Sequence, residues 1–220
     1  MADCKIKRLI HFFYRSDFLF CNELSKAEKT RERIIVAAFN EMHEHGYQGM
    51  RIENILKETH LAKGALYYYF PSKKKLGYAV VDEILFERLK QQLSLLDSAD
   101  DPMQIMCELM NTCCDSISSE DISLGCPLNN LIQEMTSLDE GFQKRLLGIF
   151  TYWQESIARA LEKGKQQGQI KPDVNSDIVA AFIISSMQGC KGTAKNMQSQ
   201  DMLRNLLGTL CQYIDSLRIV

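Results

Sequence analysis

The chain has 220 residues, of which 45% are hydrophobic and 25% are charged, a balance typical of a globular protein and unlike that of a disordered chain. The formal net charge of −2 excludes a histone-like polycation. Because only 12 Gly and 4 Pro interrupt the chain, its long uninterrupted stretches predict helices rather than many short strands.

Residues 1–24 are the candidate targeting segment. Three basic residues precede an apolar run, but Arg15 and Asp17 break it, so the run is too short for a secretory signal or a membrane span. We therefore expect residues 1–25 to form a loosely packed N-terminal extension. The alternative is that the native protein starts near Ser25.

The eight cysteines include no CxxC pair, and the four histidines lie far from them in the sequence. We therefore expect no metal site and no cofactor. Without an export signal, the thiols are expected to be reduced in the cytoplasm.

Apolar residues recur at helical spacing from residue 26 to the end of the chain. We expect the first helix to stop at Gly46, a typical C′ residue, and Ser72 to cap the fourth helix. The expected helices span residues 26–44, 51–59, 63–70, 73–96, 102–118, 128–136, 139–167, 176–197 and 200–217.

Two of these helices, at 51–59 and 63–70, are short and are joined by a tight turn, which predicts a helix-turn-helix. In this motif the second helix enters the major groove of DNA. Leu66 and Phe70 are four residues apart and are expected to face the core. Three consecutive tyrosines are hard to place in a core, because their hydroxyl groups need partners; an aromatic packing cluster remains the alternative.

Basic residues are concentrated in the same part of the chain. Residues 1–80 hold 14 Lys and Arg against 9 Asp and Glu, whereas residues 81–220 hold 12 against 19. A positive surface around the second short helix would favour contact with phosphates.

The segment KGALYYYFPSKKKL, residues 63–76, has the spacing G-x-LYxYFxSKxxL, and Gly46, Ile52 and Ile55 precede it. With this pattern, residues 27–80 resemble the amino-terminal domain of the TetR family of bacterial transcriptional regulators. The resemblance implies a homodimer with a variable ligand-binding carboxy-terminal domain, and in most members it implies repression.

By position, the resemblance implies two kinds of DNA contact. Base-edge contacts fall on Lys63, Gly64, Ala65 and Tyr68. Phosphate contacts fall on Arg51, Tyr67, Tyr69 and Lys73. Three residues depart from the family pattern: His60 replaces a turn Gly and must accept a positive φ, Ala62 replaces a Ser or Thr cap, and Leu56 replaces a common Ala.

The predicted fold is therefore all-α, with a three-helix helix-turn-helix DNA-binding domain joined by a long helix to a helical ligand-binding and dimerisation domain. The predicted domains are an extension at 1–25, the DNA-binding domain at 26–75 and the second domain at 76–220.

The last two helices carry a stripe of large apolar residues and a stripe that includes small ones, which suits a symmetric four-helix dimer interface. A purely intramolecular core is the alternative. The predicted dimerisation residues are Phe182, Gly189, Leu203, Leu207, Leu210 and Ile214.

The helices between 102 and 167 are expected to enclose a small-molecule effector that releases the protein from operator DNA by a population shift. The candidate ligand-binding residues are Met106, Met110, Cys126, Phe150 and Trp153.

A sharper alternative places a redox or electrophile sensor at Cys126, which opens a predicted helix, with Cys113 and Cys114 as resolving thiols. The Gly-Cys sequence there is similar to TetR-like sensors of electrophiles and oxidants. A thiol enzyme is disfavoured because no acid or base joins Cys126 in a recognisable constellation. A helical module that binds protein is the remaining alternative. The prediction is a DNA-binding regulator that is not an enzyme.

Overall fold

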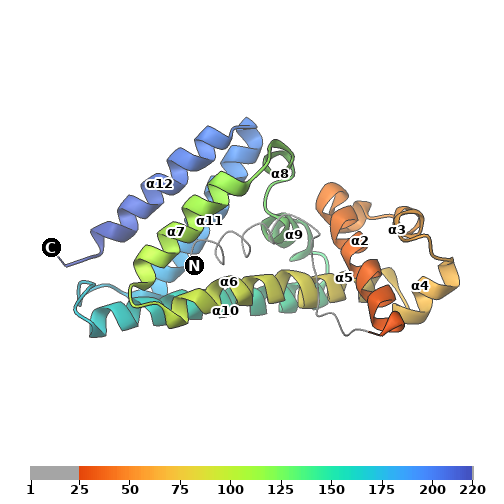
Figure 1. Ribbon diagram of the computed structural model, residues 1–220, viewed down its shortest axis with the longest axis horizontal. Helices are drawn as coiled ribbons and strands as arrows, with labels where there is room; N and C mark the ends of the chain where they lie inside the picture. The colour runs from red at the N-terminus through yellow and green to blue at the C-terminus, as the bar shows by residue number, and fades with distance from the viewer. Residues whose placement is uncertain (1–24, 220) are drawn as a thin grey trace. The chain divides into compact units, whose positions relative to one another are not determined.

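The computed structural model describes residues 25–219, so the predicted extension, apart from Ser25, lies outside the described residues. Within this range the secondary structure is helical apart from one isolated bridge between Ile170 and Arg218 (Figure 1). The all-α prediction is confirmed.

The described residues divide into two compact units. The N-terminal unit contains residues 25–88 and 127–147, and the C-terminal unit contains residues 89–126 and 148–219. The contacts thus group 127–147 with the helix-turn-helix region, whereas the sequence placed it with the second domain. The predicted domain boundaries stay a prediction.

The helix-turn-helix region of the N-terminal unit folds as the sequence predicts. Its successive elements are α2 (Lys26–Gly49), α3 (Ile52–Thr59), α4 (Lys63–Tyr69), α5 (Lys73–Ala79) and the π-helical segment η1 (Val80–Leu85). The later part of this unit holds α9 (Pro127–Met135) and the start of α10 (Glu140–Gln166).

Helix α2 begins at a capping box, in which Ser25 and Glu28 each accept a hydrogen bond from the other's backbone N–H. The expected stop at Gly46 is only partly right. Gly46 leaves helical geometry with φ 73° and ψ 168°, but the helix resumes and ends at Gly49. The result is a kink, because a glycine adopts this backbone conformation without steric cost.

The long fourth helix of the sequence prediction is present but is not a uniform α-helix. It contains α5, the π-helical segment η1 and then α6 (Phe86–Ser98). The sequence analysis did not predict η1.

The C-terminal unit contains the rest of α6 and α10 together with α7 (Pro102–Ser116), α8 (Ser119–Leu124), α11 (Ser176–Met197) and α12 (Gln200–Ser216). Helix α8 was not predicted; the expected helix at 102–118 ends at Ser116, and a capping box between Ser118 and Asp121 starts the new one. The predicted bounds of α11 are confirmed.

Helices α7 and α12 pack side by side in opposite directions. The Gln200 side-chain amide donates to the carbonyl of Cys114, near the end of α7 (2.8 Å), whereas Arg218, just past α12, pairs with Asp101 at the start of α7 (3.0 Å). These two contacts hold both ends of the helix pair.

Candidate nucleic-acid interface and effector cavity

Helix α4 is anchored by one face. Leu66 is 0% exposed and Phe70 is 3% exposed, which confirms that both face the core. The guanidinium carbon of Arg31 lies 5.0 Å from the centre of the Phe70 ring, a cation–π contact that ties the end of α4 to α2. These contacts fix which face of α4 points outward.

The other face of α4 is open to solvent. Lys63 and Gly64 are exposed, and a Cβ added at Gly64 would meet nothing within 4 Å. Tyr68 is 83% exposed, and its ring packs edge-on against that of Tyr69 at 5.2 Å. An aromatic side chain this exposed contributes little to the core of the chain and is well placed to bind a partner.

The turn between α3 and α4 has both backbone features that the sequence predicts. His60 has φ 54°, in the left-handed region, as expected where a glycine is usual. Ala62 occupies the N-cap of α4 and provides no side-chain hydrogen bond to it.

The two predicted phosphate contacts that flank α4 differ in their surroundings. Arg51 is exposed, and its backbone N–H donates to Glu41 (3.1 Å). The Lys73 ammonium donates to the carbonyl of Gln48 (2.9 Å) and lies 5.1 Å from the centre of the Tyr47 ring. An ammonium has three donors, so a phosphate contact by Lys73 would be made alongside this internal one.

Sequence reasoning missed Glu134 in α9. Its carboxylate accepts hydrogen bonds from the backbone N–H groups of Tyr47 (2.9 Å) and Gln48 (2.8 Å), directly after the Gly46 kink. The carboxylate satisfies two donors that the broken helix leaves without their intrahelical partners. Glu134 thereby ties α9 to the kink that leads into α3.

Sequence reasoning also missed Asp139, which precedes α10. Its carboxylate binds the Lys74 ammonium (2.8 Å), the Tyr78 hydroxyl (2.5 Å) and the backbone N–H of Phe142 (3.0 Å). The hydrogen bonds from Lys74, Tyr78 and Phe142 hold the pKa of Asp139 well below its usual range. Both carboxylates follow the recognition motif by more than fifty residues, so no local pattern could connect them with it.

The C-terminal unit contains a small, mostly apolar cavity of about 60 Å³. Three of the predicted ligand-binding residues line it, namely Met106, Met110 and Trp153. Phe150 and Cys126 are not among its lining residues, and Cys126 is buried. The other lining residues are Leu89, Gln92, Leu93, Leu96, Leu109, Cys113, Ile157, Met187, Lys191 and Leu207.

The residues expected at a dimer interface separate into two groups. Phe182, 50% exposed, and the exposed Gly189 lie on the open face of α11, as does Ile178. Four residues of α12 are instead buried within the chain, namely Leu203, Leu207, Leu210 and Ile214. The part that these six residues play in a dimer stays a prediction.

Between residues 25 and 219, no group of three or more His, Cys, Asp or Glu side chains could hold a metal ion. In the same range, none of the helices has the length and apolar character needed to cross a membrane.

Known protein families match both parts of the chain. The family model described as bacterial regulatory proteins, tetR family, matches residues 34–80, and the model described as tetracyclin repressor-like, C-terminal domain, matches residues 102–210.

Individual proteins agree with these matches. An uncharacterized HTH-type transcriptional regulator in the lacX 3′ region of Lactococcus lactis subsp. lactis is 35% identical over 140 residues, which cover 63% of this chain and 71% of that protein. The HTH-type transcriptional repressor DhaR of Mycobacterium sp. (strain GP1) is 28% identical over 159 residues, covering 72% and 79% of the two chains. The crystal structure of a TetR transcriptional regulator from Chloroflexus aurantiacus J-10-FL has the same fold, with a TM-score of 0.78 at 24% identity over 90% of this chain and 100% of that one.

Proposed function

Since the chain belongs to the TetR family of bacterial transcriptional regulators, and is therefore a DNA-binding regulator, we propose that the exposed face of α4 reads its operator. The observation that supports this proposal best is the contrast across α4. Leu66 is fully buried, whereas Lys63, Gly64 and Tyr68 are exposed to solvent. A lysine, a small residue and a tyrosine hydroxyl are suited to base edges and phosphates.

The phosphate contacts in this proposal come from Arg51, Tyr67, Tyr69 and Lys73, and Ala65 completes the base-reading face. Arg51 is exposed at the start of α3, and Tyr67 and Tyr69 are half-buried beside Tyr68. Half-burial suits a phosphate contact, because packing holds the ring while the hydroxyl group reaches outward.

A salt series on DNA binding tests the interface. We expect Arg51→Ala to weaken binding to all sequences and to reduce the slope of log K against log salt by about one. Lys63→Ala should also change which bases are preferred. The matched control is Lys144→Ala, which removes an exposed lysine from α10. The proposal fails if Lys144→Ala and Lys63→Ala have equal effects.

We propose that two copies associate through the open face of α11, around Ile178, Phe182 and Gly189. Large apolar side chains exposed beside a glycine allow close approach of a second helix, and a two-fold axis would pair the same face of each copy. The family's repressors, such as DhaR, suggest that the dimer represses transcription.

We further propose that the cavity between α6, α7, α10, α11 and α12 receives the effector. Its volume of about 60 Å³ equals that of roughly two water molecules in the liquid. Ligand pockets usually measure about 300–1,000 Å³, so an effector of ordinary size must widen the C-terminal unit as it binds. The ligand would then favour a wider conformation, and a population shift of about 1–3 kcal/mol would lower operator affinity roughly 5- to 150-fold.

Thiol sensing at Cys126 is the weaker candidate, because Cys126 is buried. We expect a thiol-specific reagent to change operator binding of the wild type and of Cys126→Ser to the same extent. A response lost only in Cys126→Ser would favour the sensor. The relatives are transcriptional regulators, which are not enzymes, and we propose no catalytic activity for this chain.

A further inference from the structure

Three sulfur atoms meet in the middle of the seam between α7 and α12. Cys107 and Met110 lie one helical turn apart on α7, and Cys211 faces them from α12. The Cys107 and Cys211 thiols interact with each other across the seam. The Cys211 thiol in turn donates to the thioether sulfur of Met110 at 3.9 Å. Cys211 is therefore linked to both sulfurs of the opposite helix.

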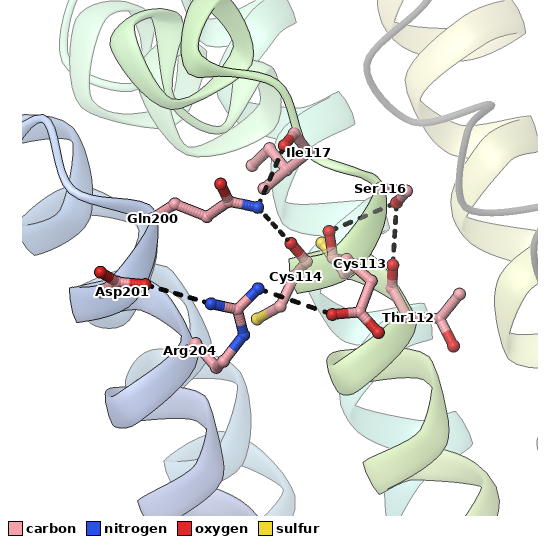
Figure 2. Close-up of polar contacts among 9 residues, drawn as sticks. Thr112, Cys113, Cys114, Ser116, Ile117, Gln200, Asp201 and Arg204 are labelled. Carbon is pink, nitrogen blue, oxygen red and sulfur yellow. Dashed lines mark hydrogen bonds and ion pairs between the residues drawn. The ribbon is translucent and has the colours of Figure 1, made fainter.

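Polar contacts hold the seam on both sides of this cluster. At one end, Figure 2 shows the Gln200 side chain reaching the carbonyl oxygens of Cys114 and Ile117, at 2.8 and 3.4 Å. Beside it, the Arg204 guanidinium pairs with Asp201 at 3.2 Å (Figure 2) and with Asp115 at 3.6 Å.

At the other end of the seam, Arg218 pairs with Asp101 at 3.0 Å and with Asp215 at 3.3 Å. Because both ends are fixed, the sulfur atoms are held near one another before any ligand arrives. Such preorganisation is a requirement for a metal site of defined geometry.

The donors and their spacing select a class of metal ion. Thiolate and thioether ligands favour soft ions such as Cu(I) over hard divalent cations. Two ligands at a metal–sulfur distance of about 2.3 Å and 120° apart are separated by about 4 Å, close to the 3.9 Å between Cys211 and Met110. Zinc would need more nitrogen or thiolate donors than this cluster offers, in line with the lack of a three-member His, Cys, Asp or Glu group in the described part of the chain.

Burial gives the cluster a dry side and an entrance. Met110 and Cys211 are buried, at 2% and 9% exposed, whereas Cys107 is half-buried. An ion can therefore reach Cys107 first and then pass to the two buried sulfurs. Exclusion of water beyond that point favours a low coordination number, which suits a monovalent soft ion.

We propose that Cys107, Met110 and Cys211 form a binding site for one monovalent soft metal ion of the Cu(I) type. The ion displaces two protons, one from each thiol, and binds two thiolates and the neutral thioether. The sulfur atoms and the metal keep their oxidation states. The bound ion links α7 to α12, and it also fixes Met110, which lines the neighbouring cavity.

Anaerobic titration with Cu(I) against a chromophoric Cu(I) chelator tests the site on the reduced full-length chain, without DNA. We expect the wild type to take one ion from a chelator strong enough to outcompete single thiols. Cys107→Ser and Cys211→Ser should weaken this binding about a hundredfold or more, as befits loss of a direct ligand. Met110→Leu keeps the volume and removes only the thioether, so it should weaken binding less.

The matched control is Cys190→Ser, which removes a half-buried thiol from α11. The proposal is overturned if Cys190→Ser loses the ion as Cys107→Ser does, or if Cys107→Ser binds like the wild type. Because Cys107 is half-buried, its variant is expected to fold even if the Cys211 variant does not, and circular dichroism checks this.

X-ray absorption of the copper-loaded protein gives a second readout. Three sulfur neighbours in the wild type and two in Met110→Leu support the site, whereas two in both overturn it. A Cys107–Cys211 disulfide formed in air, with no Cu(I) uptake after reduction, would also overturn the proposal. None of these measurements depends on operator binding, so they can fail while the proposed DNA-binding function holds.

Discussion

Removal of the Glu134 carboxylate should destabilise the kink between α2 and α3. A hydrogen bond to a charged group contributes about 1.5–3 kcal/mol when its partner is kept from water. Glu134 accepts two such bonds, but Gln48 is exposed and its N–H can turn to solvent, whereas Tyr47 is half-buried. The expected loss for Glu134→Ala is therefore about 2 kcal/mol, dominated by the Tyr47 bond.

Urea unfolding followed by circular dichroism measures this loss. Glu134→Gln keeps one acceptor oxygen and should cost about half as much. The control is Glu155→Ala, which removes an exposed carboxylate from α10 and should change stability by less than about 0.5 kcal/mol. If Glu134→Ala is no more destabilising than this control, the carboxylate does not support the kink.

Four other substitutions test further features of the structure. Gly46→Ala should destabilise the protein by about 1–3 kcal/mol, because the φ of 73° and ψ of 168° at this position favour glycine. The new Cβ would also lie 2.9 Å from a carboxylate oxygen of Glu134. No change in stability in urea unfolding would argue against a fixed kink. Because the folded pKa of Asp139 is lowered, its stabilising contribution should be full above about pH 4, the usual range of the unfolded group, and should be lost as pH falls through the folded pKa. The difference in unfolding free energy between wild type and Asp139→Asn should accordingly shrink on acidification, and a constant difference from pH 6 to pH 3 would contradict this. Leu207→Ala should lower the free energy of unfolding by about 2–5 kcal/mol. Phe182→Glu should instead halve the mass measured by light scattering, with no comparable loss of unfolding free energy. If only Leu207→Ala dissociates the dimer, Leu207 rather than Phe182 lies at the interface.

Local chemistry made the helix-turn-helix predictable. Leu66 and Phe70 lie four residues apart, so one helical face had to be apolar, and the structure buries both. His60 and Ala62 depart from the family pattern, and each departure predicts one specific local feature of the backbone. Both consequences are present, namely the left-handed φ at one position and the missing side-chain cap at the other.

Long-range contacts explain what the sequence did not reveal. Nothing in the sequence distinguishes Glu134 and Asp139 from ordinary surface carboxylates. Their roles arise because residues 127–147 pack within the N-terminal unit. The sulfur cluster depends in the same way on pairing α7 with α12. Cysteine spacing alone had argued only against zinc.

The helices α11 and α12 show why a hydrophobic stripe cannot by itself identify an interface. Periodicity reports that one face of a helix avoids water, but burial by the same chain and burial by a second copy satisfy that requirement equally. In α12, Leu203 and Ile214 are buried within the chain, so folding alone removes their apolar side chains from water. In α11, Phe182 stays half exposed, and a Cβ added at Gly189 or Gly192 would meet nothing within 4 Å. A symmetric partner should therefore seat on α11, where small residues leave room for another backbone, and the leucines of α12 should act on the dimer only through the stability of the unit that presents α11.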